Sequence, residues 1–369
     1  MTELGSNERP PLLELEHVKM WFPVWAGGGG GKRRHVHAVD DVTLVVGEGE
    51  TLGLVGESGC GKTTLARCAV RLLKPTAGTV RFGGSDITSL GSRAMRPYRS
   101  RVQIVFQDPQ GSLNPRKRVS QIVGAGLRLA KGDGSIDDRV RQLLAQVGLN
   151  PEHANRYPHE FSGGQRQRIG VARALAVKPE LIVLDEPVSA LDVSIRAQVV
   201  NLLSDLQDEL GLSYVFVAHD LSVVRHVSDR IAVMYLGKVV ELSPAEELYS
   251  RPVHPYTVSL LAAIPIPDPA LSRSRARVIT RGELPSPIDP PPGCRFHTRC
   301  PGATDICRQV EPPLTRYQGG HEAACHHPLN VSQSDIAAAA RSPASSLSAG
   351  PDLPQAPGGP QVAEVPTGG

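Results

Sequence analysis

Residues 56–63 read Gly-Glu-Ser-Gly-Cys-Gly-Lys-Thr and match the pattern G-x-x-x-x-G-K-[ST]. The glycines of this pattern let backbone N–H groups curl around phosphate oxygens, and the helix that follows adds the partial positive charge of its N-terminus. Lys62 is expected to reach the β- and γ-phosphates, and Thr63 to bind Mg²⁺. The predicted phosphate-binding residues are Gly56, Ser58, Gly59, Cys60, Gly61, Lys62, Thr63 and Thr64. The motif predicts a nucleoside triphosphatase without indicating which one.

Two adjacent acids, Asp185 and Glu186, follow a run of four apolar residues. Such a run predicts a buried strand, and open α/β sheets bind ligands at the carboxyl ends of their strands. One acid at that place can hold Mg²⁺, and its neighbour can polarise an attacking water. Paired acids at strand ends are common, but beside a phosphate loop they indicate hydrolysis of a nucleoside triphosphate.

A second segment is also suited to a phosphate. Ser162, Gly163, Gly164 and Gln165 precede a predicted helix over 166–176, whose N-terminus would attract an anion. A single phosphate loop does not need two such cradles. The simplest explanation is a dimer in which the cradle of each subunit covers the nucleotide bound to its partner.

Together these motifs resemble those of the ATP-binding subunits of ABC transporters. The matching segments are residues 56–63, 106–109, 162–165, 185–186, 189–192 and 218–220, in the order that the family has. The resemblance implies the α/β fold of a P-loop NTPase of ABC type. That fold has a RecA-like α/β core, an antiparallel β subdomain and a helical subdomain, here followed by a small Cys-containing C-terminal extension.

The resemblance also implies roles for single residues. Gln107 resembles the residue that senses Mg²⁺ and the attacking water, and His219 resembles the switch histidine that contacts the γ-phosphate. With Glu186, these are the expected catalytic residues. Asp192 lies in the loop that crosses the dimer interface in the family. The expected Mg²⁺ ligands are Thr63, Gln107 and Asp185. The family stacks Tyr or Phe on adenine, whereas residues 35–37 here read His-Val-His.

The part of the chain after residue 250 resembles the C-terminal extension of oligopeptide and dipeptide importer ATPases. The matching stretches are residues 251–257, 282–287, 293–296 and 299–301, with 114–116 and 186–194 in the core. The resemblance covers roughly residues 12–329. It implies a peripheral subunit on the cytoplasmic side of the cell membrane that uses ATP to power import of oligopeptides or dipeptides.

The implied partners are a second ATP-binding subunit, two transmembrane permease subunits and an extracytoplasmic solute-binding protein. A heterodimer is favoured over a homodimer, because such importers often pair two different ATPases. The cargo could instead be nickel, glutathione or another small solute, since the ATPase does not touch it. A soluble ABC ATPase without a transport role is a further alternative, although such proteins usually have two cassettes or a long inserted coiled coil.

Four of the six cysteines lie in the extension, with the spacing C-x5-C-x6-C-x17-C. They are Cys294, Cys300, Cys307 and Cys325. Disulfides are disfavoured in the cytoplasm, so clustered cysteines suggest a metal. Zinc prefers tighter knuckles, which favours a [4Fe–4S] cluster. Zinc, with His297, His326 or His327 as a further ligand, and free thiols remain alternatives. Cys60 and Cys68 are expected only to pack.

Hydrophobic periodicity predicts the elements that must position these residues. Strands are expected at 13–18, 42–46, 51–55, 181–184 and 214–218, and helices at 62–73, 135–148, 166–176 and 194–210. Ser135 is the expected N-cap of the second helix and Gly211 the C-cap of the last.

Composition is ordinary for a globular protein. Of 369 residues, 40 are Lys or Arg and 37 are Asp or Glu, so the net charge of +3 predicts no nucleic-acid binding. No stretch approaches the roughly 20 apolar residues of a membrane span, and the N-terminus lacks a signal peptide, so a cytoplasmic chain is expected. The expected organisation is a disordered N-terminus (1–11), an ATP-binding domain (12–250) with a helical subdomain at about 108–165, the extension (251–329) and a disordered tail (330–369). A flexible loop is expected at 27–31.

Overall fold

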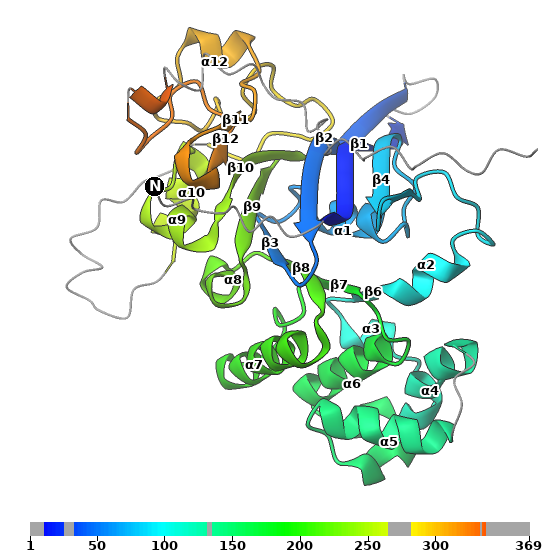
Figure 1. Cartoon of the computed structure of the whole chain (residues 1–369). Coiled ribbons are helices and arrows are strands. Elements are labelled where there is room, and N and C mark those ends of the chain that lie inside the picture. The colour runs from blue at the N-terminus through cyan, green and yellow to red at the C-terminus, as the bar shows by residue number, and fades with distance from the viewer. Residues whose placement is uncertain (1–10, 26–32, 131–134, 265–281, 333, 337–369) are drawn as a thin grey trace, which may run out of the picture.

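The largest sheet contains the strand that leads into the phosphate loop (Figure 1). Its strands are β3 (Thr51–Val55), β6 (Val102–Val105), β7 (Leu181–Asp185), β8 (Ser213–Ala218), β9 (Arg230–Tyr235), β10 (Lys238–Pro244), β11 (Thr315–Arg316) and β12 (Glu322–Ala323). The eight strands follow the order β11-β12-β10-β9-β3-β8-β7-β6, and those from β9 to β6 are parallel. This computed structural model describes residues 11–25, 33–130, 135–264, 282–332 and 334–336.

The central strands are apolar throughout because helices or a second sheet cover both of their faces. On β7, Ile182 and Leu184 join the core under the helices, whereas Leu181 and Val183 join the core that faces the other sheet. Successive side chains of a strand point to opposite faces, so a strand buried on both sides reads as a continuous apolar run. The predicted strands at 51–55, 181–184 and 214–218 are confirmed within one residue at each end.

The second sheet is antiparallel. Its strands are β1 (Pro11–Trp25), β2 (Arg33–Gly47), β4 (Ala77–Phe82) and β5 (Ser85–Asp86), in the order β2-β1-β4-β5. β1 and β2 are much longer than predicted, and they stay paired from Pro11 opposite Gly47 to Trp25 opposite Arg33. Irregular register between Leu15 and Trp21 interrupts the alternation, which is why the periodicity identifies only the first part of β1.

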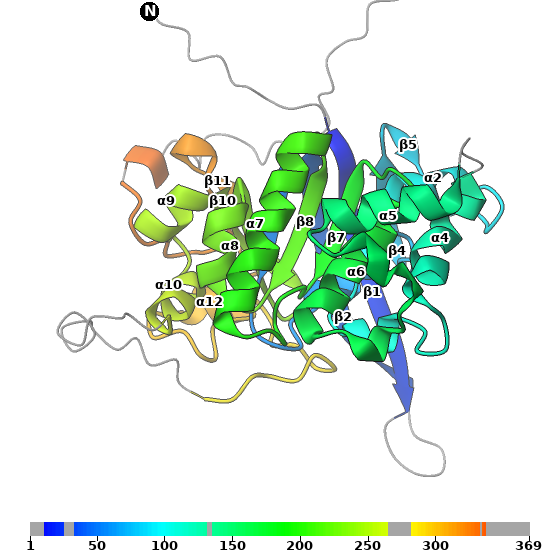
Figure 2. The ribbon, with the colours of Figure 1, turned by 90° about the horizontal axis from the view of Figure 1, so that it is seen from below.

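Most helices cover one face of the large sheet, and the second sheet, with α1 (Lys62–Ala69) beneath it, covers the other face (Figures 1 and 2). The other helices are α2 (Arg96–Arg101), α3 (Pro109–Ser112), α4 (Val119–Ala130), α5 (Ile136–Gln146), α6 (Gly163–Leu175), α7 (Val193–Leu210), α8 (Leu221–Val227), α9 (Ala245–Ser250), α10 (Pro255–Ala262) and α12 (Asp305–Gln309). α1 packs between the two sheets, and α7 contacts α6 and α8. The prediction that α1 continues to residue 73 is wrong, because Arg71 adopts a left-handed conformation (φ 55°) that a helix cannot continue.

The helical subdomain between β6 and β7 is built around α4, α5 and α6. Ser135 caps α5 by accepting a hydrogen bond from the backbone N–H of Asp138, as predicted. The apolar stripe of this helix, represented by Val140 and Leu143, is fully buried. α7 ends at Gly211, whose φ of 64° supplies the expected left-handed C-cap.

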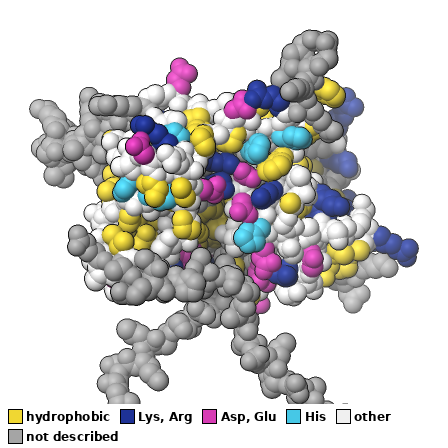
Figure 3. Space-filling model, turned by 90° about the horizontal axis from the view of Figure 1, so that it is seen from above, with side chains coloured by type: hydrophobic (Ala, Val, Ile, Leu, Met, Phe, Trp, Pro, Cys, Tyr) yellow, Lys and Arg dark blue, Asp and Glu magenta, His cyan; other side chains and the backbone are white. Residues whose placement is uncertain are grey.

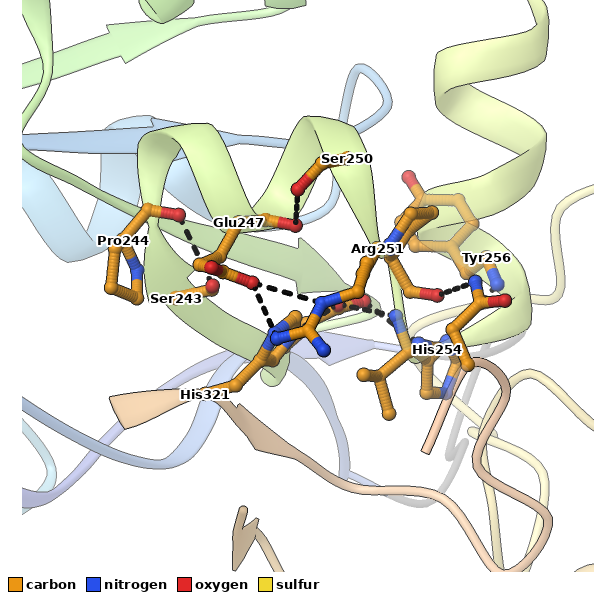
Figure 4. Close-up of polar contacts among 12 residues, drawn as sticks. Ser243, Pro244, Glu247, Ser250, Arg251, His254, Tyr256 and His321 are labelled. Carbon is orange, nitrogen blue, oxygen red and sulfur yellow. Dashed lines mark hydrogen bonds and ion pairs between the residues drawn. The ribbon is translucent and has the colours of Figure 1, made fainter. Parts of the chain in front are cut away.

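The C-terminal extension joins the large sheet, because β12 pairs with β10. The fully buried Glu241 of β10 accepts hydrogen bonds from the backbone N–H groups of Val253 (2.7 Å) and His254 (2.9 Å). Nε2 of His321, next to β12, lies 2.6 Å from the same carboxylate (Figure 4). Burial lowers the pKa of His254 to about 4, so its neutral ring can accept a hydrogen bond from the N–H of Tyr256. Glu241 therefore connects both halves of the extension to the sheet.

The face of the molecule seen in Figure 3 carries basic, acidic and histidine side chains interspersed with one another. No helix within the described ranges is both long and apolar enough to cross a bilayer. The segments expected to be disordered or flexible (1–11, 27–31 and 330–369) fall largely outside the described residues, apart from residue 11 and a few positions near 330.

Replacing Glu241 with Ala should lower the free energy of unfolding by about 3 kcal/mol, because two buried N–H groups and a histidine lose their acceptor. Urea unfolding of the full chain measures this change. The control is Glu246→Ala, since the Glu246 side chain is exposed and forms a surface ion pair with Arg225. Equal stability of both variants would contradict the anchoring role of Glu241.

Candidate nucleotide-binding site

A cavity of about 630 Å³ opens at the carboxyl ends of β3, β8 and β7. Its volume lies within the usual range for small-molecule pockets. Six residues of the phosphate loop line it: Ser58, Gly59, Gly61, Lys62, Thr63 and Thr64. The remaining lining residues are Val36, Ala38, Gln107, Glu186, Ser189, Ala190, His219 and Pro287. Gly56 and Cys60, also predicted to bind phosphate, are buried behind the loop.

The phosphate loop requires glycine for steric reasons. Gly56 has φ 151°, and a Cβ there would lie 2.2 Å from the carbonyl oxygen of Met234. Gly61 has φ 110°, and its Cβ would lie 2.0 Å from the carbonyl oxygen of Ala38. Both contacts are with backbone, which cannot move aside as a flexible side chain can. The loop can therefore pack this closely against β9 and β2 only without side chains at these positions.

Lys62 is only 4% exposed and its ammonium lies inside the loop. Nζ donates hydrogen bonds to the carbonyl oxygens of Gly56 (2.8 Å) and Glu57 (3.0 Å). A buried cation needs such partners, because taking an ammonium out of water is costly. These bonds hold the charge at the centre of the curled backbone, where an anionic ligand would meet it.

Asp185 lies at the end of β7 and touches the first turn of α1. The hydroxyl of Thr63 donates a 2.8 Å hydrogen bond to Oδ1 of Asp185, which is 1% exposed. Burial raises the pKa of Asp185, and the bond from Thr63 partly opposes that shift. A hydroxyl and a carboxylate are hard oxygen ligands of the kind that Mg²⁺ prefers. The pair therefore fits the expected magnesium site.

Gln107, Glu186 and His219 come from three different loops and meet at the cavity. The amide of Gln107, after β6, donates a 2.9 Å hydrogen bond to Oε2 of Glu186. Nδ1 of His219, after β8, lies 3.3 Å from the same oxygen. Glu186 has φ 47°, and its backbone N–H donates to the carbonyl oxygen of Val217 on the neighbouring strand. This strained turn aims the carboxylate into the cavity. The structure thus brings together the three residues expected to be catalytic.

The second predicted cradle lies apart from this cavity. Ser162 caps α6 by accepting from the N–H of Gln165 (3.3 Å), and the Gln165 side chain accepts from the N–H of Ser162 (2.9 Å). A Cβ on Gly164 would lie 2.3 Å from the side chain of Ile195, so the cradle packs tightly against α7. Neither this segment, Gly163 included, nor Asp192 at the start of α7 lines the cavity.

Two residues of the extension contact the phosphate loop, and the sequence predicts neither contact. The N–H of Glu57 donates to the hydroxyl of Tyr256 (2.9 Å), and Nη1 of Arg299 donates to the Glu57 carboxylate (2.8 Å). The hydrogen bond that Arg299 donates to Glu57 raises the pKa of the Arg299 guanidinium. Both partners stand in stretches that resemble importer ATPases, but those stretches give no indication of what they touch. The extension therefore fixes the position of Glu57 in the phosphate loop through hydrogen bonds to its backbone and its side chain.

Residues 35–37, where the family has Tyr or Phe, place no aromatic side chain in the lining of the cavity. The ring of His37 lies 4.4 Å from the ring of Trp21, and its Nδ1 lies 3.5 Å from Asp40. Val36 lines the cavity instead. The residue of this stretch that lines the cavity is therefore aliphatic.

The four extension cysteines are free thiols in one neighbourhood. Burial raises the pKa of Cys294 to about 11 and that of Cys325 to about 12, and negative charge on the other extension thiols adds to both shifts. Among the described residues, however, no three or more His, Cys, Asp or Glu side chains form a group that could hold a metal ion. The expected [4Fe–4S] cluster at Cys294, Cys300, Cys307 and Cys325 and the alternative of zinc are therefore both unsupported by the described residues.

Fold and site together define an ATP-binding cassette ATPase. Two solved structures are similar to this chain: the dimeric cassette MJ0796 bound to ADP and Pi (29% identity, TM-score 0.56) and the dimeric bacterial ABC transporter cassette of the same protein (30%, 0.56). Each covers 63% of this chain and 99% of the solved chain. Residues 39–189 match the family model described as ABC transporter, and residues 240–307 match the one described as oligopeptide/dipeptide transporter, C-terminal region.

Two curated relatives extend the match to most of the chain. The oligopeptide transport ATP-binding protein AppF of Bacillus subtilis is 52% identical, over 88% of this chain and 99% of its own length. The oligopeptide transport ATP-binding protein OppF of Salmonella typhimurium is 52% identical, over 84% and 94%. This chain belongs to the oligopeptide/dipeptide family of ABC transporter ATP-binding subunits, and it is an ATPase.

Replacing Arg299 with Met should remove the ion pair with Glu57 while keeping most of the apolar volume of the side chain. Arg299 is 9% exposed and the Glu57 side chain 30%, so we expect a loss of about 1–2 kcal/mol in stability and weaker ATP binding. Thermal unfolding and ATP titration measure these effects. The control Arg308→Met removes an exposed ion pair with Asp305 in the same extension. If both variants behaved alike, the extension would not hold the phosphate loop.

Proposed function

We propose that this chain hydrolyses ATP to power import of oligopeptides or dipeptides, as a peripheral subunit on the cytoplasmic side of the membrane. The observation that carries the transport role is the match of residues 240–307 to the oligopeptide/dipeptide transporter C-terminal region. The pocket alone would support only an ATPase. Relatives named oligopeptide transport proteins favour peptide cargo over nickel or glutathione.

In the proposed reaction, the phosphate loop and Lys62 bind the triphosphate and stabilise the charge that builds up on the β- and γ-phosphates. Thr63, Asp185 and Gln107 would hold Mg²⁺, which would supply positive charge to neutralise the phosphates. Glu186 accepts a hydrogen bond from the attacking water and polarises it towards the γ-phosphorus.

The amide of Gln107 and the ring of His219 restrict the Glu186 carboxylate to the orientation that this role requires. Both groups lie within 3.3 Å of the same oxygen, so the carboxylate is already oriented before a water arrives. His219 would also contact the γ-phosphate. In this arrangement Gln107 and His219 respond directly to the presence of the triphosphate.

The active unit is proposed to be a dimer with two shared sites. Ser162, Gly163, Gly164 and Gln165 lie outside the cavity of their own chain, and a helix N-terminus attracts anions. They are proposed to cover the γ-phosphate bound by the partner, with Asp192 in the loop between the sites. The similar solved cassettes are described as dimeric. We favour a heterodimer with a second ATP-binding subunit of this family.

The remaining partners are proposed from the family. Two transmembrane permease subunits would contact the helical subdomain, which begins directly after the loop that carries Gln107. Dimer closure would then reach the permeases through the same residue that contacts Glu186. A solute-binding protein outside the membrane would deliver the peptide.

Glu186→Gln should reduce steady-state ATP hydrolysis at least 100-fold and leave ATP binding intact, since only the water-polarising charge is lost. A phosphate-release assay and an ATP titration separate the two effects. Glu209→Gln, at an exposed position of α7, is the matched control. Turnover of the Glu186 variant within about threefold of wild type, under about 1 kcal/mol in barrier, would exclude Glu186 as the base.

We further propose a [4Fe–4S] cluster at Cys294, Cys300, Cys307 and Cys325. A cluster presents its irons at separate corners, so its four thiolates converge less closely than ligands of one ion do. The N–H of Cys294 donates a 2.8 Å hydrogen bond to the carbonyl oxygen of Cys307, so these two cysteines are neighbours in the folded extension.

Anaerobically purified protein should then be brown and contain about four irons per chain. Cys300→Ser should lower the iron content, whereas Cys68→Ala, at a buried cysteine of α1, should not. Colourless, iron-free protein with four titratable thiols in the extension would rule the cluster out.

A further inference from the structure

The two ends of the nucleotide cavity differ in chemistry. Lys62, Glu186 and His219 place charged and polar groups around the phosphate loop. The rest of the lining includes Val36, Ala38 and Pro287, whose side chains carry no charge, donor or acceptor. An apolar wall of this kind does not suit phosphates, but it does suit the face of a purine.

β2 sets the distance between this wall and the phosphates. The carbonyl of Ala38 lies directly against Gly61 of the phosphate loop. Val36 is two residues away on the same face of the strand, which places it roughly 6–7 Å further along. A nucleotide with its phosphates in the loop would carry its base on this side of the cavity, beyond the ribose.

Pro287 reaches the wall from the C-terminal extension. The N–H of His37 donates a 2.9 Å hydrogen bond to the carbonyl oxygen of Pro287, which fixes the segment beside β2. Arg34 forms an ion pair with Asp289 two residues later. In Figures 1 and 2 the yellow segment after residue 281 runs alongside β2. Two contacts with one strand thus hold Pro287 beside β2, and Val36, which lies between Arg34 and His37, lines the same cavity as Pro287.

We propose that Val36 and Pro287 together form the contact surface for the nucleobase of ATP. The His37 ring packs against the ring of Trp21 on the other face of β2. It therefore offers no stacking surface to the cavity. The Pro287 ring and the Val36 methyl groups instead pack on the base and exclude water from it. The extension thereby becomes part of the nucleotide site itself. The proposal rests on the ATP-binding role proposed for this cavity.

The test compares binding of ATP with binding of tripolyphosphate, which has no base, to the full chain in the presence of Mg²⁺. Pro287→Asp and Val36→Asp should each weaken ATP binding about tenfold or more, because a carboxylate next to the base is poorly solvated. The same variants should change tripolyphosphate affinity less than about threefold, since the phosphate loop is untouched.

Ser286→Asp is the matched control. It adds the same charge one residue away, at a position that does not line the cavity, and Asp can keep the hydrogen bond that Ser286 accepts from the N–H of Ile288. It should leave both affinities near those of wild type. Thermal unfolding of each variant confirms that the fold is retained.

Unchanged ATP affinity in both the Pro287 and Val36 variants would overturn the proposal, as would equal losses for ATP and tripolyphosphate. Lys62→Ala tests the underlying site separately and should weaken binding of both ligands. If Lys62→Ala changed neither affinity, the cavity would not be the triphosphate site, and the proposed function would fail together with this inference.

Discussion

The parallel register of β3, β8 and β7 is the constraint on which the site depends. Val55 pairs with Ala218 and Asp185 with Val217, so all three strands end at one edge of the sheet. Backbone hydrogen bonds between neighbouring strands hold them in that register. The apolar cores on both faces of the sheet oppose a shift of one strand by one residue along its neighbour. The loops that follow can therefore bring Lys62, Asp185 and His219 together, although they come from widely separated parts of the sequence.

A second layer of constraint comes from buried charges between the extension and the ATPase core. Arg295 donates to Asp40 and to the carbonyl of Leu236, and Arg299 donates to Glu57 in the phosphate loop. Burial would raise the pKa of Asp40, but Arg295 and Lys238 together lower it. Leaving any of these groups unpaired would be costly, so the extension has a strongly preferred position on the core. This explains how a segment with few large apolar residues stays docked beside the nucleotide cavity.

In the proposed dimer, each chain would contribute one part of a shared site. Glu186, Gln107 and His219 are assembled around the cavity, whereas Ser162 and its neighbours are ordered by their own capping box at a distance from it. Hydrogen bonds within one chain therefore already hold both groups of residues. Such preorganisation means that closure of a dimer would cost little internal rearrangement, which suits an ATPase whose conformational change must act on partners.

The sequence by itself determined the phosphate loop, the buried strands at 51–55, 181–184 and 214–218 to within one residue, and the family, because these depend on local patterns of glycine, charge and apolar residues. It could not predict the length of β1 and β2, since irregular register breaks their alternation, or the early end of α1 at Arg71. Only the tertiary structure decided that Val36 and Pro287 face the same cavity and that Arg299 holds Glu57. The physical reason is that these contacts join residues about 240–250 positions apart. The position of the extension on the ATPase core, and not a local sequence pattern, determines which of these residues come into contact.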